Sequence, residues 1–159
     1  MPKPYEYRVL DLKRTLTYRL ARMQAKLNAQ ASELIERHCG LSLSEWRILA
    51  VLSDVDVRTQ KDVLKLIGMD KGQASRTIKK LQDQSLISID FDLVDNRVRT
   101  LALTDAGWDI IKTMHPIMTK RQAHIRSDLS DDELSSLIDM IDRVEAKSNK
   151  LNDEDLLDE

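Results

Sequence analysis

Two consecutive helical patterns joined by a very short link constrain the fold of this chain more than any other feature. The first pattern covers residues 59–67 and stops at Gly68, and the second covers residues 71–82 behind a capping Asp70. Only three residues, Gly68 to Asp70, lie between them, and so short a turn makes two helices cross steeply. The link predicts a helix-turn-helix, with Gln73 completing the cap of the second helix.

Two strand-like runs follow the second helix. Residues 86–91 and 99–103 are rich in β-branched and apolar side chains, and a polar loop that carries Asp95, Asn96 and Arg97 joins them. Runs of this length around a polar loop predict a β-hairpin. A helix-turn-helix followed by a hairpin is the layout of a winged helix-turn-helix, so the expected fold class is mainly α with a small β-hairpin wing.

Amphipathic patterns precede this central part. Apolar residues recur at helical spacing over residues 9–38, which predicts one long helix. A capping box of Ser42 and Glu45 opens a further helix over residues 43–52. The buried face of that helix is expected to comprise Trp46, Leu49, Ala50 and either Val51 or Leu52.

Two more helices are predicted behind the hairpin. Thr104 caps one that continues through Pro116, where the missing donor should bend the helix. Ser130 and Glu133 form the capping box of the last helix. The predicted organisation is an N-terminal dimerisation helix (1–40), a winged helix-turn-helix domain (41–104), C-terminal dimerisation helices (105–150) and an acidic tail (151–159).

The terminal helices carry more apolar surface than one small winged domain can cover, which predicts a homodimer of intertwined terminal helices. Charge favours the same pairing. The first thirty residues hold seven basic and two acidic side chains, whereas residues 128–159 hold three basic and twelve acidic ones. Ends of opposite sign attract, although exposed pairs add little energy individually. The alternative is that both ends are ordinary solvated faces.

Positive charge is concentrated on the second helix of the helix-turn-helix. Residues 71–82 hold four basic side chains and no acidic one, whereas the whole chain has a formal charge of −2. A basic helix beside a hairpin is the electrostatic pattern of a surface that binds double-stranded DNA. Arg76 and Gln73 suit paired contacts with base edges, and the lysines and Ser75 suit phosphates. The candidate DNA-contacting residues are Lys71, Gln73, Ser75, Arg76, Lys79, Lys80, Asp95, Arg97 and Arg99.

Two motifs in this order resemble the MarR family of bacterial transcriptional regulators. They are Leu66-x-x-x-Asp70-Lys71-x-x-x-Ser75-Arg76 on the helix-turn-helix, and Asp95-x-Arg97 followed by Leu103-Thr104-x-x-Gly107. The order of elements is similar over almost the whole chain. The resemblance implies a homodimer that represses transcription from a pseudo-palindromic operator. Residues 71–82 would then enter the major groove and Arg97 the minor groove, with Asp95 orienting Arg97 or its neighbourhood.

The resemblance also implies a small effector. Many members of the family bind small aromatic acids in a cleft between the dimer helices and the winged domain, so an aromatic or acidic ligand is expected to relieve repression. The side chains that could line such a cleft are Tyr18, Arg22, Trp46, Met114 and Met118. The alternative is that these side chains are ordinary core or interface residues.

The chain departs from the family pattern at two positions. Ser85 stands where the family usually has glycine between helix and hairpin, and Ile89 stands where it often has arginine on the first strand. Asp90, Asp92 and Asp95 make the wing acidic apart from its two arginines. These departures leave open an alternative function, a winged-helix protein-interaction module with weak DNA binding.

Other classes of function have little support in the sequence. His38, His115 and His124 lack the spacing of metal ligands, and no nucleophile and base stand in a catalytic arrangement, so no metal, cofactor or enzymatic activity is expected. The single cysteine, Cys39, cannot form an internal disulfide, and it is either a redox sensor or a small buried residue. No apolar run approaches a membrane-spanning length, and the protein is expected in the cytoplasm.

Overall fold

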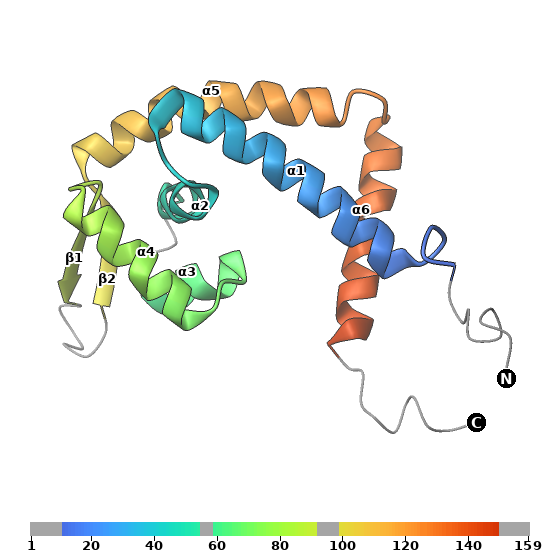
Figure 1. Ribbon diagram of the computed structural model, residues 1–159, viewed down its shortest axis with the longest axis horizontal. Helices are drawn as coiled ribbons and strands as arrows, with labels where there is room; N and C mark the ends of the chain where they lie inside the picture. Colours follow the sequence, from blue (N-terminus) through green and yellow to red (C-terminus); the bar gives the residue numbers. More distant parts are fainter. Residues whose placement is uncertain (1–10, 55–58, 92–98, 150–159) are drawn as a thin grey trace, which may run out of the picture. The chain divides into compact units, whose positions relative to one another are not determined.

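The computed structural model describes residues 11–54, 59–91 and 99–149. These residues form six helices and one β-hairpin, as Figure 1 shows. In chain order the elements are α1 (Leu16–Cys39), α2 (Leu43–Leu52), α3 (Gln60–Ile67), α4 (Lys71–Asp83), β1 (Ile87–Phe91), β2 (Arg99–Leu103), α5 (Asp105–Ile125) and α6 (Asp131–Ser148). The predicted fold class, mainly α with a small β-hairpin wing, is confirmed.

The chain divides into two compact units, Met1–His115 and Pro116–Glu159. The division falls inside α5 at Pro116, which has no backbone N–H to donate to the preceding turn. The first unit holds the helix-turn-helix and the hairpin, and the second holds the end of α5 and α6. The bend at Pro116 and the domain boundaries at residues 40, 104 and 150 stay predictions.

Helix α1 begins later than its apolar periodicity predicts. It starts at Leu16, behind Thr15 in an extended conformation, although the pattern predicts a start at residue 9. The residues before it form a turn around Asp11, whose carbonyl oxygen accepts from Arg14 N at 2.9 Å and from Thr15 N at 3.1 Å. The Asp11 carboxylate accepts a further backbone N–H two residues on. Such local bonds compete with helix formation and delay the start of α1.

Helix α2 begins with the predicted capping box of Ser42 and Glu45, but its buried face differs from the prediction. The buried residues are Glu45, Ile48, Leu49 and Leu52. These positions have the spacing of one helix face, whereas Trp46 and Ala50, predicted to be inside, are half-buried. Glu45 can lie on the buried face because Ser42 and Lys80 of α4 both bind its carboxylate.

The predicted helix-turn-helix is confirmed by α3, the turn and α4. Thr59 caps α3, and Gly68 ends that helix as predicted, with φ +61°, in the left-handed region that glycine adopts without strain. Asp70 Oδ1 accepts from Gln73 N at 2.8 Å and caps α4. The reciprocal bond predicted for the Gln73 side chain is wrong, because its amide donates to Ser44 Oγ on α2 instead, at 3.4 Å.

The hydrophobic core of the first unit includes one face of α4. The buried residues of this helix are Ala74, Ile78 and Leu81, whose spacing puts them on one face. The other buried apolar residues of the core are Ala31, Ile35, Leu41, Ile48, Leu49, Leu52, Val63, Ile87, Leu101, Ile111 and Met114. Because α4 buries this face, its opposite face is left to solvent.

The hairpin packs one face on this core. Strands β1 and β2 pair antiparallel, with Ile87 opposite Leu103, and Ile87 and Leu101 are buried. Thr100 of β2 also forms an isolated antiparallel bridge with Thr59, at the start of α3. The wing is therefore attached to the helix-turn-helix through both of its strands, by β1 following α4 and by β2 pairing with Thr59.

The link from α4 to β1 is a Schellman motif with serine in its left-handed position. Ser85 has φ +58°. Its N–H donates to Gln82 O at 2.8 Å, and Leu86 N donates to Leu81 O at 2.9 Å. A side chain in this region of φ costs roughly 1–2 kcal/mol, a cost that glycine does not have. The link therefore requires a left-handed residue, which the glycine of the family pattern supplies without strain and Ser85 supplies with strain.

We expect Ser85→Gly to raise the free energy of unfolding by up to ~1 kcal/mol, because the relieved strain exceeds the entropy that glycine adds to the unfolded chain. Urea denaturation at one protein concentration measures the change. Ser53→Gly is the matched control, since Ser53 ends α2 with an ordinary φ of −74° and glycine should not stabilise there. Equal or lower stability of Ser85→Gly would contradict the strain.

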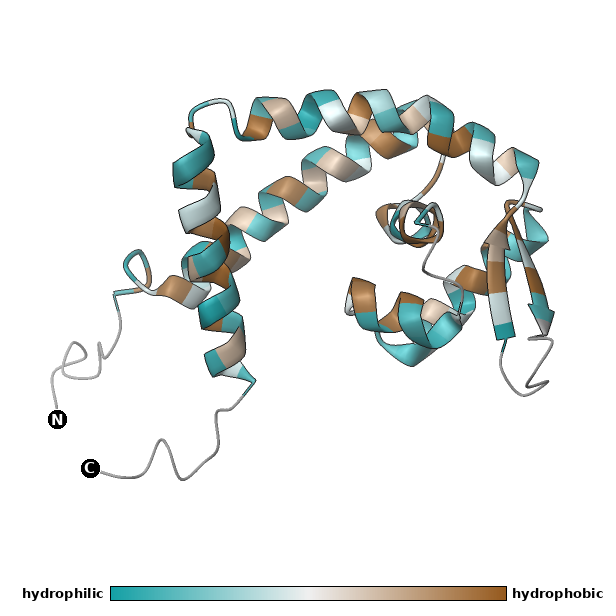
Figure 2. Cartoon of the chain, turned by 180° about the vertical axis from the view of Figure 1, so that it is seen from behind, coloured by the Kyte–Doolittle hydropathy of each residue, from teal (hydrophilic) through white to brown (hydrophobic). Residues whose placement is uncertain are grey.

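The second unit consists of the end of α5 and α6. Ser130 and Glu133 form the predicted capping box of α6, and Glu133 Oε2 accepts from Ser130 N at 2.8 Å. No residue of α6 is buried within the described part of the chain, and brown bands along the helix mark its apolar positions in Figure 2. The exposed large apolar residues of α6 are Leu137, Ile138, Met140, Ile141 and Val144.

Candidate nucleic-acid interface

The solvent-facing side of α4, called the α4 face below, gathers the helix residues predicted to contact DNA. The exposed members of the predicted set on this helix are Lys71, Gln73, Ser75, Arg76, Lys79 and Lys80. The helix has no acidic side chain from Lys71 to Gln82, so the α4 face is positive. A single helix with one buried face and one basic, exposed face is a shape that the major groove of DNA admits.

Arg76 lies in the middle of the α4 face, about one turn from both Gln73 and Lys80. Its guanidinium extends toward the start of the helix, as long side chains on helices do. Arg76 Nη1 lies 3.5 Å from the point that a Cβ on Gly72 would occupy, and Asp70 Oδ1 lies 3.3 Å from the same point. A guanidinium in this position can present the paired donors that guanine O6 and N7 accept.

Lys79 and Lys80 are adjacent but have different surroundings. Lys79 Nζ lies 3.3 Å from Asp83 Oδ1, and both side chains are largely exposed. An exposed pair of this kind contributes little, so the Lys79 ammonium is available to a phosphate. Lys80 Nζ instead lies 2.9 Å from Oε1 of Glu45 on α2, a side chain that is only 2% exposed.

Glu45 is a buried carboxylate held by two elements. Its Oε2 accepts from Ser42 N at 2.8 Å and from Ser42 Oγ at 2.6 Å. Its Oε1 has no partner besides Lys80 Nζ within the described residues. Burial opposes ionisation of this carboxyl, but the bonds from Ser42 and the Lys80 ammonium outweigh burial and hold the pKa of Glu45 below its ordinary value. Glu45 is therefore charged at neutral pH.

A hollow of about 680 Å³ lies at the starts of α3 and α4 beside β2. Its lining residues are Thr59, Gln60, Lys61, Asp62, Leu64, Lys71 and Arg99. Lys71 and Arg99 belong to the predicted set, and Lys61 joins them as a cation that the sequence did not single out. Cations around one hollow attract a phosphate. The Thr59–Thr100 bridge brings Lys61 to this hollow. A local sequence pattern cannot indicate a contact between residues so far apart in the chain.

The predicted contacts at the tip of the wing, Asp95 and Arg97, lie outside the described residues. The third predicted wing residue, Arg99, is exposed at the start of β2 and stands opposite Phe91 in the register of the hairpin. The structure thus places the loop end of the two strands beside the starts of α3 and α4. The minor-groove role of Arg97 stays a prediction.

The five residues predicted for an effector site have different exposures. Tyr18 and Arg22 on α1 are exposed, Trp46 and Met118 are half-buried, and Met114 is fully buried. Met118 belongs to the second unit, whereas the other four belong to the first. A hollow of about 540 Å³ contains Trp46 alone of the predicted set, and its lining residues are Gln24, Asn28, Trp46, Arg47, Ala50, Val51, Leu66 and Ile67.

Cys39 is half-buried at the end of α1, where its Sγ lies 3.1 Å from Ile35 O. Burial raises the pKa of the Cys39 thiol, and the nearby Glu36 and Glu45 carboxylates raise it further against one opposing backbone hydrogen bond. A reactive cysteine needs the opposite conditions, namely an electropositive and exposed surrounding. Of the two interpretations of this residue, the surroundings favour the small buried residue over the redox sensor.

Within residues 11–54, 59–91 and 99–149, no helix has the length and apolar character needed to cross a membrane. The same ranges contain no group of three or more His, Cys, Asp and Glu side chains arranged to hold a metal ion. His38, His115 and His124 are all exposed.

Comparison with known proteins agrees with this architecture. Residues 40–95 match the sequence profile of the MarR family. The HTH-type transcriptional regulator TcaR of Staphylococcus aureus is 26% identical over 129 residues, which cover 77% of this chain and 85% of TcaR. YdgJ of Bacillus subtilis, an uncharacterized HTH-type transcriptional regulator, is 26% identical over 112 residues, 70% of this chain and 68% of YdgJ.

Solved structures show the same fold. A MarR/EmrR family transcriptional regulator from Acinetobacter sp. ADP1 aligns with a TM-score of 0.83 and 22% identity, over 89% of this chain and 100% of that one. MepR of S. aureus in complex with DNA aligns with a TM-score of 0.75 and 19% identity, over 84% of this chain and 98% of MepR. PcaV of Streptomyces coelicolor in complex with its natural ligand aligns with a TM-score of 0.71 and 21% identity, over 87% of this chain and 97% of PcaV.

The basic α4 on a short turn and the following hairpin define the chain as a winged helix-turn-helix protein. The similarity of its sequence and fold places it more narrowly. The chain is a winged-helix regulator of the MarR type.

Proposed function

We propose that this protein is a dimeric repressor that binds a pseudo-palindromic operator. The observation that carries the proposal is the α4 face, where the basic residues lie on one exposed side of a helix whose other side is fixed in the core. A helix of this kind reads base edges in the major groove, and the cations beside it bind the flanking phosphates. Lys61, Lys71 and Arg99 around their hollow extend the phosphate contacts toward the wing.

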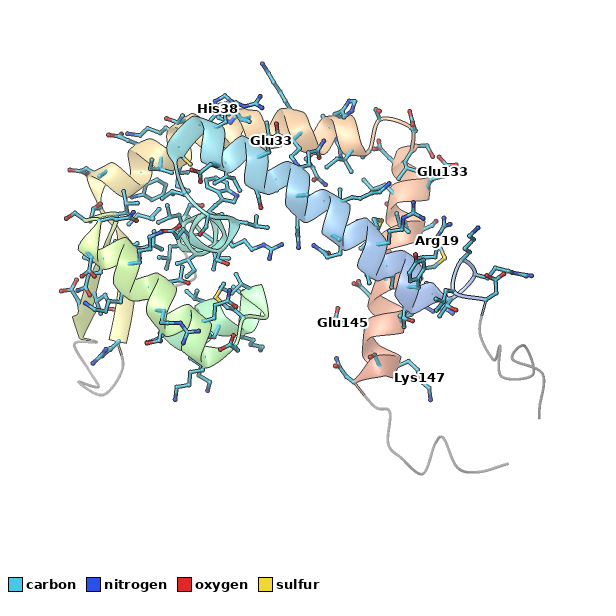
Figure 3. The ribbon with its side chains drawn as sticks, viewed as in Figure 1. Arg19, Glu33, His38, Glu133, Glu145 and Lys147 are labelled. Carbon is cyan, nitrogen blue, oxygen red and sulfur yellow. The ribbon has the colours of Figure 1, made fainter. Side chains whose placement is uncertain are left out.

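A homodimer is supported by apolar surface that each unit leaves exposed. The large exposed apolar side chains of the N-terminal part are Leu12, Leu16, Tyr18 and Met23, and α6 has its own exposed apolar face. Charge complements these faces, with Arg19 projecting from α1 and Glu133 and Glu145 from α6 (Figure 3). A two-fold dimer would cover both faces and place two α4 helices on two half-sites.

Selection of binding sites from random duplexes with the purified protein tests this function, together with sedimentation to give the mass. We expect a site with inverted symmetry and a species of twice the 18.3 kDa chain mass. A monomer at micromolar concentration would contradict the proposed dimer and, with it, the palindromic operator. Equal binding of all duplexes would favour instead the winged-helix protein-interaction module with weak DNA binding.

A small aromatic acid is the proposed effector. Support comes from the hollow beside Trp46, where Arg47 Nη2 donates to Asn28 Oδ1 at 2.9 Å and retains further donors for a carboxylate. The indole of Trp46 offers an aromatic face in the same hollow. PcaV, which has the same fold, is known in complex with its natural ligand. Benzoate titrated against the protein–DNA complex tests the proposal, and release of DNA is the expected result.

A further inference from the structure

Two contacts join the start of α2 to α4. Glu45 Oε1 lies 2.9 Å from Lys80 Nζ, and Ser44 Oγ accepts from Gln73 Nε2 at 3.4 Å. Gln73 and Lys80 are seven residues apart, so they lie on the same flank of α4, roughly 10 Å from each other along its axis. Contacts at two points on one flank restrain both rotation of α4 about its axis and sliding along α2.

The contact of Lys80 is the stronger of the two. The Glu45 side chain is only 2% exposed, and its Oε1 depends on the Lys80 ammonium for a partner within the described residues. Salt screens a buried charge much less than it screens exposed charges, so this carboxylate holds the ammonium more firmly than Asp83 holds the exposed Lys79. The Lys80 side chain is 60% exposed, but its ammonium is already paired with a carboxylate of its own domain.

We propose that Glu45 is a positioning residue for DNA recognition, which acts through Lys80 to set the rotation of α4 that presents Arg76 to the bases. Arg76 stands about one turn before Lys80 on the helix, so a rotation of α4 that follows loss of the ion pair moves Arg76 as well. Lys80 then serves the geometry of the α4 face and does not neutralise a DNA phosphate. This inference rests on the proposed DNA-binding function and revises the phosphate contact predicted for Lys80.

The test compares Lys80→Met with Lys79→Met, its neighbour on the same helix. The full-length variants are titrated with the selected duplex and an unrelated duplex at several salt concentrations. For Lys80→Met we expect the ratio of the two affinities to fall about tenfold, or ~1.4 kcal/mol, with the salt slope of the parent. Lys79→Met should weaken both duplexes alike and reduce the slope by about 1, as loss of one phosphate contact does.

Glu45→Gln is the second arm of the test, because glutamine keeps the shape of the side chain and loses its charge. We expect Glu45→Gln to lower the affinity ratio as Lys80→Met does. The double variant should lower it no further than either single change, since both remove one interaction. Lys80→Arg keeps the charge and should retain the affinity ratio of the parent. These comparisons separate positioning from a general loss of stability, which circular dichroism and the Tm of each variant record.

A salt slope that falls by about 1 in Lys80→Met, with the affinity ratio of the parent, would overturn the proposal and return Lys80 to the phosphate contacts. Independent effects of Glu45→Gln and Lys80→Met in the double variant would overturn it as well. Failure of the proposed function has a different signature. In that case the parent protein itself would bind the two duplexes equally, which would overturn both.

Discussion

Gly107→Ala is expected to lower the free energy of unfolding by about 3 kcal/mol, a typical upper value for an overpacked site. A Cβ on Gly107 would stand 2.2 Å from Leu86 O and 3.2 Å from Leu103 Cδ2. The first of these is a backbone atom, which cannot move away by changing a rotamer. Leu86 O also accepts from Thr104 N at 3.2 Å, so any shift that makes room breaks the junction between α5 and the hairpin.

Gly72→Ala is the matched control for this prediction. Gly72 also lies in the first turn of a helix, but its Cβ would meet only the ends of two side chains, Asp70 Oδ1 at 3.3 Å and Arg76 Nη1 at 3.5 Å. Alanine there should leave stability within about 1 kcal/mol of the parent, because helix propensity favours it. Urea midpoints at equal protein concentration measure both variants. Equal stability of the two alanine variants would contradict the close approach of Leu86 O to Gly107.

Local signals explain why so much of the fold is predictable from the sequence. The caps Ser42, Thr59, Asp70 and Ser130 each act on a backbone N–H three residues on, so every one of them can be recognised within a short window. The α4 face follows from the same kind of local pattern, since helical spacing alone separates its basic residues from its buried ones. Ser85 stands out in sequence only as a departure from a family pattern, and its φ of +58° supplies the reason.

The parts that the sequence misses depend on contacts between distant residues. Burial of Glu45 cannot be read from its capping box, because the charge that makes burial tolerable comes from Lys80 on another helix. Lys61 enters the candidate interface only because Thr59 pairs with Thr100 across forty residues of chain. The effector residues show the same limit, since the exposure of Tyr18 and the full burial of Met114 follow from packing that periodicity does not encode.

Arg76→Ala is expected to weaken binding to the selected operator by about 1–3 kcal/mol, or roughly fivefold to 150-fold. The reason is the loss of paired donors from the middle of the α4 face, where Arg76 lies over the unsubstituted Gly72. The variant should also accept any base at one position of each half-site, because a guanidinium distinguishes guanine through two acceptors at once. Titration with a set of duplexes altered at single positions measures both effects.

Arg37→Ala removes the same charge from the last turn of α1 and is the control. Its side chain is 63% exposed and paired with Glu33 on its own helix, so its loss should change operator affinity by less than about 0.5 kcal/mol, as surface substitutions usually do. The two variants have the same net charge, so a difference between them isolates the position of Arg76 from bulk electrostatics. If Arg76→Ala keeps the base preference of the parent and loses only affinity common to all duplexes, Arg76 is a phosphate contact and base recognition belongs to another residue of the α4 face.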